Sequence, residues 1–296
     1  MAASRPKMHV DELDVDAALV RRLVGSQFPQ WAALPLEPVP ERGTDNALYR
    51  LGPELVVRLP VTDAKAATLA KEREWLPRLA PHLPLAVPVP VAEGAPGEGY
   101  PCSWSVYEWL SGVDGTAGPI ADPAPQLAAF VRALQAVDVN GAPAGRGVSL
   151  AERDAAFRAS LTRLPPDLDR SAALAGWESA LRAPPWPGPP VWAHGDLDAR
   201  NVLVEGGRLV AVIDWGSSGV GDPACEAMVA WKLVPAGQRD AFRAELDVDD
   251  ATWERARGWA LSQAVIALGY YTDVTNPILV AESRRWLAEV LAGGSD

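Results

Sequence analysis

Short apolar segments separated by turn residues predict a β-rich region in the first hundred residues. Residues 36–41, 47–51 and 54–59 have the length and composition of strands, and Gly52-Pro53 supplies a turn between the last two. The run CSWSVYEWL, residues 102–110, is apolar with little alternation, as in a strand buried on both faces. Ser111-Gly112 is expected to end it.

Helical spacing of apolar residues first occurs after the strand predicted at 54–59, and it dominates the second half of the chain. Residues 64–79 place Ala66, Leu69, Leu76 and Leu79 at approximately helical intervals, and Pro77 is expected to kink or shorten the last turn. Further helices are predicted at 125–137, 150–161, 171–181, 223–234, 238–245, 250–268 and 278–291, with prolines at 165–166 and 184–190 as breakers.

This distribution predicts an α+β protein with two lobes. A small β-rich lobe would span residues 1–107, a hinge 108–112, and a larger helical lobe 113–296. A chain of 296 residues is long enough for two such cores. Its 48% hydrophobic and 22% charged residues are ordinary for a globular protein.

Composition and charge restrict the partners. The net charge of −11 disfavours nucleic acid and anionic membrane, and no apolar run reaches the roughly 18 residues that span a bilayer. An acidic surface suits a small cationic substrate, although the same charge is equally expected if it serves solubility alone. Cys102 and Cys225 lack metal spacing and are expected to be reduced thiols in a cytoplasmic protein.

The segment 191–226 carries the strongest chemical signal. Asp196 precedes Asn201 by five residues, and Asp214 follows beyond a short hairpin centred on Gly206-Gly207. With a two-residue turn, Asn201 would pair with Val212, which places Asn201 and Asp214 at the open end of the hairpin beside Asp196.

Such an arrangement is typical of phosphoryl transfer. One carboxylate accepts a hydrogen bond from the attacking hydroxyl, while an amide oxygen and a second carboxylate hold Mg²⁺ against a nucleotide triphosphate. The plainer alternative is that Asp196 caps a turn and that Asn201 and Asp214 close strand ends. It explains each residue but not their convergence. His194 is assigned a structural role, because no second histidine or cysteine lies nearby.

The β-rich lobe offers weaker signals for phosphate binding. Residues 43–46, GTDN, lie between two strands and could cover phosphates, although they contain one glycine. Arg58 ends a strand, and Glu72 on the following helix could pair with it. A surface ion pair of little energetic value is the alternative for these two residues.

These segments together resemble the aminoglycoside phosphotransferase family, small-molecule kinases with a protein-kinase-like fold. HGDLDARN, residues 194–201, resembles the catalytic loop HGDxxxxN, VIDWG resembles the counterpart of the kinase DFG segment, and GDPACE resembles GDPxxD. GTDNALYRL, VVRLP and KEREWLPRLAPHLP resemble the nucleotide loop, the strand with the phosphate-contacting cation and the glutamate-bearing helix. WSVYEWLSG resembles the adenine-binding linker. The resemblance extends from about residue 30 to 290.

The resemblance implies a role for each matching position. Asp196 would be the catalytic base, and Asn201 and Asp214 the magnesium ligands. ATP or GTP would be bound by Arg58, paired with Glu72, together with Asn46, Glu108, Trp109 and Leu110. The acceptor site is the least legible part, with candidates Asp198, Trp231, Tyr270, Tyr271 and Asp273.

Three positions depart from the family pattern. Asp198 stands where many members have histidine, and Arg58 replaces the lysine of kinases. Glu226 occupies a position where aspartate is usual, so no metal role is assigned to it.

The resulting hypothesis is an ATP- and Mg²⁺-dependent phosphotransferase acting on a hydroxyl of a small molecule. An aminoglycoside-like or other amino-bearing antibiotic is the first candidate, which would make the chain an antibiotic-resistance kinase. The alternatives are a metabolic kinase for an amino alcohol, a sugar or a macrolide, and a nucleotide-binding protein without catalysis. A protein kinase is disfavoured because no Ala-Pro-Glu segment follows Asp214.

Overall fold

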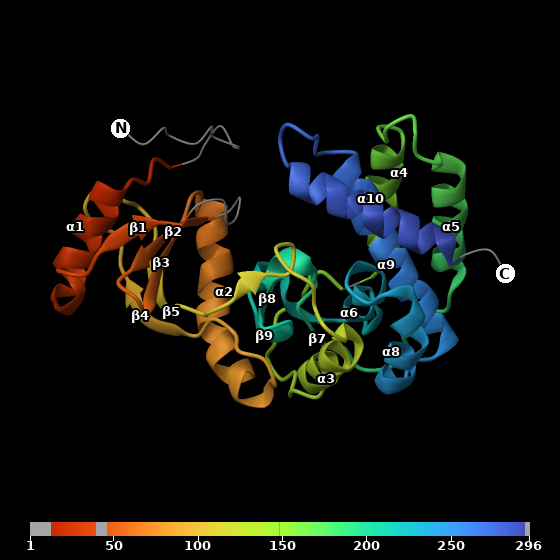
Figure 1. The fold of residues 1–296 in the computed structure, drawn as a ribbon, viewed down its shortest axis with the longest axis horizontal. Helices are drawn as coiled ribbons and strands as arrows, with labels where there is room; N and C mark the ends of the chain where they lie inside the picture. The colour runs from red at the N-terminus through yellow and green to blue at the C-terminus, as the bar shows by residue number, and fades with distance from the viewer. Residues whose placement is uncertain (1–12, 40–45, 148, 294–296) are drawn as a thin grey trace. The chain divides into compact units, whose positions relative to one another are not determined.

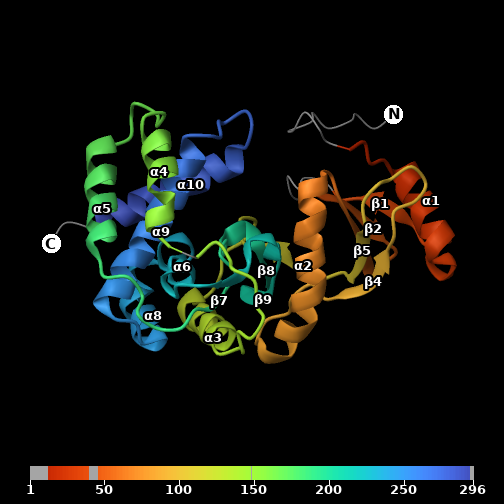
Figure 2. The same ribbon diagram turned by 180° about the vertical axis from the view of Figure 1, so that it is seen from behind.

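Two compact units make up the computed structural model, which describes residues 13–39, 46–147 and 149–293 (Figures 1 and 2). Of the described residues, those up to 81 and 86–111 form the first unit, and 82–85 and those from 112 onward form the second. The division after Ser111 falls inside the expected hinge. The predicted α+β class is confirmed, with an antiparallel sheet in the first unit and mostly helices in the second.

A five-stranded antiparallel sheet is the centre of the first unit. Its order is β1-β2-β3-β5-β4, built from β1 (Leu36–Pro38), β2 (Asn46–Leu51), β3 (Leu55–Pro60), β4 (Pro90–Gly94) and β5 (Trp104–Glu108). The helices of this unit are α1 (Ala17–Gln27) and α2 (Asp63–Leu79). The carboxylate of Asp16 accepts a hydrogen bond from the backbone N–H of Leu19 at 2.7 Å and so fixes the start of α1.

Side-chain alternation along β3 assigns these two helices to opposite faces of the sheet (Figure 1). Val57 and Leu59 are buried in the apolar core with Leu23 of α1. Arg58, between them, therefore points to the other face, where Glu72 of α2 meets it. The alternation of side chains along β3 therefore places the Arg58 guanidinium on the face covered by α2.

The second unit combines a three-stranded sheet and a two-stranded sheet with eight α-helices among its described residues. The antiparallel sheet β6-β8-β9 is formed by β6 (Val113–Asp114), β8 (Val202–Glu205) and β9 (Arg208–Val212), while β7 (Val191–Ala193) pairs with β10 (Gly219–Gly221). The helices are α3 (Pro123–Gln135), α4 (Asp154–Leu161), α5 (Arg170–Arg182), α6 (Ala224–Ala227), α7 (Val229–Lys232), α8 (Arg239–Leu246), α9 (Asp250–Leu268) and α10 (Pro277–Ala292).

Helix α9 is the central element of this unit. It packs against α4, α5, α6 and α10, and most of its residues are buried, as expected for a helix covered on several sides. Asp249 caps its start by accepting a hydrogen bond from the N–H of Thr252 at 2.6 Å. No helix of the described residues is long and apolar enough to cross a membrane.

The structure differs from the sequence-based expectation at several elements. The helix predicted at 223–234 is two short helices that meet at Met228. Helix α2 keeps Pro77 inside its last turn, where a missing N–H costs one hydrogen bond. Helix α1 and strands β4, β6, β7 and β10 were not predicted. Strands β6, β7 and β10 have only two or three residues, too few for an alternating pattern to be legible.

Candidate active site

The loop after β7 presents the candidate base. Gly195 has φ +79°, and a Cβ there would lie 3.0 Å from the carbonyl oxygen of Ser217, so the turn requires glycine. His194 is buried, and its Nε2 lies 3.0 Å from the carbonyl oxygen of Ile213, while its Nδ1 accepts a hydrogen bond from the N–H of Asp196 at 3.3 Å. The histidine thus has a structural contact on each ring nitrogen and ties Asp196 to the segment before Asp214.

Asn201 and Asp214 converge on the same loop. The side-chain Nδ2 of Asn201 donates to the backbone oxygen of Asp196 at 2.8 Å, and its own backbone oxygen accepts from the N–H of Ile213 at 2.9 Å. Asp214 follows immediately, is exposed, and has φ +62°. The residues expected at 196, 201 and 214 therefore belong to one continuous hydrogen-bonded segment.

The register of the hairpin was predicted only in part. Glu205 pairs with Arg208 and Val204 with Leu209, as a two-residue turn requires. A bulge between Leu203 and Val204 then shifts the pairing, so that Val202, and not Asn201, lies opposite Val212. An extra residue in one strand cannot be read from the turn alone.

Three cations surround the carboxylate of Asp196. Arg146 Nη1 lies 2.8 Å from Asp196 Oδ1, and the buried Lys232 Nζ lies 4.0 Å from the same oxygen. Burial alone would raise the pKa of Asp196, but Arg146, followed by Lys232 and Arg200, outweighs it and holds the pKa well below its usual range. Asp196 is therefore ionised at neutral pH and able to accept a hydrogen bond from a hydroxyl.

Asp198 has a structural role, which corrects its assignment as an acceptor contact. Its side chain is fully buried, Oδ2 lies 2.6 Å from Arg200 Nη2 and 3.4 Å from Lys232 Nζ, and Oδ1 accepts the N–H of Arg200 at 2.9 Å. Lys232 also donates to Gln263 Oε1 at 2.8 Å and lies 4.4 Å from the ring centroid of Trp286. A carboxylate enclosed in this way holds the loop and is not accessible to a substrate.

Glu226 also supports the loop. It is buried, and its Oε2 accepts a hydrogen bond from the N–H of Gly195 at 3.0 Å. Burial raises the pKa of this carboxyl above its ordinary value. Glu226 therefore holds in place the backbone of Gly195, the residue before Asp196.

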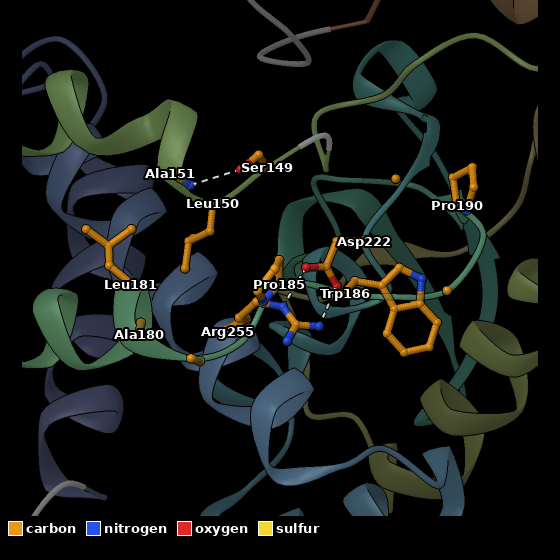
Figure 3. Close-up of a pocket in the computed structure, with 13 residues that line it drawn as sticks. Ser149, Leu150, Ala151, Ala180, Leu181, Pro185, Trp186, Pro190, Asp222 and Arg255 are labelled. Carbon is orange, nitrogen blue, oxygen red and sulfur yellow. Dashed lines mark hydrogen bonds and ion pairs between the residues drawn. The ribbon is translucent and has the colours of Figure 1, made fainter.

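A separate pocket of about 330 Å³ lies in the second unit (Figure 3). Gly221 and Pro190 line it, whereas the loop with Asp196 follows the other end of β7, because Gly221 pairs with Val191 at the start of that strand. The polar groups drawn in Figure 3 are largely engaged with each other: Arg255 donates to both carboxylate oxygens of Asp222, at 2.6 and 3.1 Å. The pocket is distinct from the candidate active site.

The predicted pair in the first unit is present and mostly buried. Arg58 donates to Glu72 through Nη1 at 2.5 Å and Nη2 at 3.2 Å, with side-chain exposures of 12% and 0%. With the Asn46 amide oxygen turned toward Arg58, that oxygen accepts from Nε and Nη2 at 3.1 and 3.0 Å. This is a fixed two-point ion pair and not the loose surface pair that was the alternative. Residues 43–45 of the suggested phosphate loop lie outside the described residues.

The segment proposed to hold adenine follows the last paired residue of β5. Glu108 pairs with Leu55, and the N–H of Trp109 donates to the carbonyl oxygen of Glu54 at 2.7 Å. That N–H is engaged within the unit. Hydrogen bonds from this segment to a nucleotide base would therefore have to come from the backbone of Glu108 or Leu110.

The remaining acceptor candidates have different environments. Trp231 is only 3% exposed and packs against Trp253 at 4.7 Å between ring centroids, so it is a core residue and not a substrate contact. Tyr270, Tyr271 and Asp273 lie in the connection between α9 and α10. Tyr270 is 68% exposed and Asp273 is exposed, so both are accessible.

Sequence reasoning missed three polar residues around Asp196. Arg146 lies in a loop of the second unit, Lys232 ends a four-residue helix in an apolar stretch, and Gln263 lies in the middle of α9. Gln263 Nε2 donates to the carbonyl oxygen of Gly195 at 3.2 Å. The one available sequence signal among them is the lysine within the apolar run AMVAWKLV, because a charged residue is unusual there. No spacing rule connects this lysine to residue 196.

Comparison with known proteins identifies the family and the fold. A family model described as "Phosphotransferase enzyme family" matches residues 37–259, more than half of the chain. No curated protein matches the sequence. A GDP and kanamycin complex of APH(2")-IIIa is similar in structure, with a TM-score of 0.73 and 22% identity over 93% of this chain and 99% of that one.

Two further solved structures share the fold. The macrolide 2'-phosphotransferase MphH from Brachybacterium faecium has a TM-score of 0.60 and 24% identity, covering 93% of this chain and 98% of that one. The streptomycin–ATP complex of APH(2")-IIa has a TM-score of 0.59 and 15% identity, covering 88% and 94%. These likenesses support the protein-kinase-like arrangement that the motifs imply.

Proposed function

The chain belongs to the phosphotransferase enzyme family, and on that premise we propose that it transfers the γ-phosphoryl group of ATP or GTP to a hydroxyl of a small molecule. Asp196 would accept the hydrogen bond of the attacking hydroxyl and take its proton as the oxygen–phosphorus bond forms. The observation that carries this proposal is the segment in which Asn201 bonds to the backbone at both Asp196 and Ile213.

The ionisation of Asp196 fits a positioning base. Because Arg146 and Lys232 stabilise its charged form, the carboxylate is a weak base that orients the hydroxyl and receives the proton late. A loose, metaphosphate-like transition state requires little early deprotonation of the nucleophile. Positioning would then contribute more to the rate than base strength.

The residues present fit Mg²⁺. The hydrogen bond from Asn201 Nδ2 to the Asp196 backbone orients the amide, so that its Oδ1 remains as the hard oxygen ligand. Asp214 supplies an exposed carboxylate in the next segment, and Mg²⁺ readily completes its shell with water and phosphate oxygens. When bound, the ion would neutralise phosphate charge.

Nucleotide phosphates are assigned to Arg58. Glu72 and Asn46 fix its guanidinium, which orders the cation in advance of binding. GDP accompanies APH(2")-IIIa and ATP accompanies APH(2")-IIa among the similar structures, which supports a nucleotide as the phosphoryl donor. Glu108 and Leu110 would present backbone groups to the base.

The acceptor class with most support is an amino-bearing antibiotic. Similar structures were solved with kanamycin, gentamicin and streptomycin, and others are macrolide phosphotransferases. A metabolic kinase acting on an amino alcohol or a sugar would use the same chemistry and is the alternative. Tyr270, Tyr271 and Asp273 are proposed as acceptor contacts because they lie in an exposed connection. A cytoplasmic location is part of the same proposal.

A nucleotide-consumption assay across acceptors tests this function. Purified protein with Mg²⁺ and ATP or GTP would be incubated with kanamycin, gentamicin, erythromycin, ethanolamine and glucose, and the products identified by mass spectrometry. At least one acceptor should gain a phosphoryl group, and Asp196→Ala should not form that product. Lack of nucleotide binding by the wild-type protein would contradict the proposal.

A further inference from the structure

The backbone of Arg146 is held against strand β10. The N–H of Arg146 donates to the carbonyl oxygen of Ser217 at 3.3 Å, and the N–H of Gly145 donates to that of Val220 at 3.1 Å. A Cβ on Gly145 would lie 2.8 Å from Gly219, so these two glycines allow the segments to approach this closely. The Arg146 side chain therefore starts from a fixed point.

The guanidinium of Arg146 connects the side chain of the candidate base to the backbone of its own loop. Nη1 donates to Asp196 Oδ1 at 2.8 Å and to the backbone oxygen of Gly195 at 3.3 Å. The Gly195 oxygen also accepts a hydrogen bond from Gln263 Nε2 at 3.2 Å, which holds it in place. A carboxylate group otherwise rotates broadly about its Cβ–Cγ bond. This bridge therefore fixes the orientation of the Asp196 carboxylate relative to the loop.

The contacts of Asp196 distinguish its two carboxylate oxygens. Oδ1 accepts the hydrogen bond from Arg146, and Lys232 Nζ lies 4.0 Å from the same oxygen. Among the residues that the structure describes, none donates a hydrogen bond to Oδ2, and the side chain of Asp196 is 25% exposed. Oδ2 is therefore the oxygen left to accept a hydrogen bond from an acceptor hydroxyl.

The other two cations near Asp196 hold a different carboxylate. Arg200 Nη2 lies 2.6 Å from Asp198 Oδ2, and the buried Lys232 lies 3.4 Å from the same oxygen. Their charges still stabilise the ionised form of Asp196. Removal of Arg146 should therefore leave a carboxylate that keeps its charge and loses its fixed orientation.

We propose that Arg146 is a positioning residue that aims Asp196 Oδ2 at the attacking hydroxyl. The inference rests on the proposed phosphoryl transfer and adds to it a residue from outside the segment 191–226. A displacement of about 1 Å in a reacting group can cost about a hundredfold in rate, so Arg146→Ala should slow transfer by about that factor. Nucleotide binding, which is assigned to other residues, should change little.

Chemical rescue by guanidinium tests this role. The side chain of Arg146 is 33% exposed, so in Arg146→Ala free guanidinium can enter the vacated space and donate to Asp196. Single-turnover transfer to the acceptor found in the nucleotide-consumption assay would be measured with and without millimolar guanidinium chloride, and nucleotide affinity by calorimetry. The controls are Asp196→Ala, which has no carboxylate to orient, and Arg158→Ala on α4, an exposed arginine paired with Asp154.

Arg146→Ala should lose about a hundredfold in transfer rate and regain about tenfold with guanidinium, while nucleotide affinity stays within about threefold of wild type. Arg146→Lys should fall between Arg146→Ala and wild type, Arg158→Ala should match wild type, and Asp196→Ala should not respond to guanidinium. An unchanged rate in Arg146→Ala, an equal loss of nucleotide affinity, or recovery by neither guanidinium nor Arg146→Lys would overturn the proposal. No transfer by the wild type to any acceptor would instead reject the proposed function, and this inference with it.

Discussion

Replacing the buried Lys232 by methionine should destabilise the second unit strongly. Methionine keeps the apolar part of the side chain against Trp286 but removes an ammonium that lies 3.4 Å from Asp198 Oδ2 and 4.0 Å from Asp196 Oδ1. At an effective dielectric constant of about 20, these separations correspond to attractions of about 5 and 4 kcal/mol before desolvation. Burial opposes the charge, since it lowers the pKa of Lys232 while Asp198 and Asp196 raise it.

The net loss is smaller than the sum of these attractions. Removing one partner of a buried pair costs about 3–5 kcal/mol, because the other charge stays buried. Arg200 remains 2.6 Å from Asp198 Oδ2, so the lower end, about 3 kcal/mol, is expected for Lys232→Met. Most single domains have stabilities of about 5–15 kcal/mol, so the variant should still fold.

Urea-induced unfolding, followed by circular dichroism, would measure this loss. Arg158→Met is the matched control, because Arg158 and its partner Asp154 are 45% and 38% exposed and should contribute little. The double variant Lys232→Met/Asp198→Asn should lose less than the sum of the single variants, because neither charge is then left alone. A loss in Lys232→Met no larger than that in Arg158→Met would refute the reasoning.

Three further outcomes follow from the site. Asp214→Asn, which tolerates the positive φ of this position, should weaken Mg²⁺–nucleotide binding at least tenfold by calorimetry, and unchanged affinity would count against the ligand assignment. Arg58→Met should raise the KM for nucleotide more than it lowers kcat in steady-state kinetics; the opposite split would exclude a binding role. The pKa of Glu226 is raised in the folded protein, so its contribution to stability is present below about pH 4.5 and lost as pH rises through the folded-state pKa. Glu226→Gln should therefore gain stability relative to wild type as pH rises in urea titrations, whereas a pH-independent difference would contradict this.

The sequence predicted those parts of the site that lie close together along the chain. Asp196 and Asn201 precede a short hairpin and Asp214 follows it, so the turn geometry alone predicted that they lie near one another, even though a bulge shifted the register. The Arg58–Glu72 pair was also accessible to prediction, because a strand and the next helix present these side chains to one face.

Residues that meet through tertiary packing could not be predicted in this way. Arg146, Lys232 and Gln263 reach residues 195 and 196 from separate elements, and their contacts depend on how those elements pack. For the same reason Asp198 was named as an acceptor contact, since its burial depends on Lys232 packing over it.

The most direct test of the central claim is to compare Asp196→Ala with wild type in single-turnover phosphoryl transfer and nucleotide binding. The claim is that Asp196 is the base of a phosphotransferase whose metal ligands are other residues. We predict that the variant binds Mg²⁺–nucleotide within about threefold of wild type and loses at least a hundredfold in transfer rate, in the range of general-base contributions. A transfer rate close to that of wild type would contradict the account.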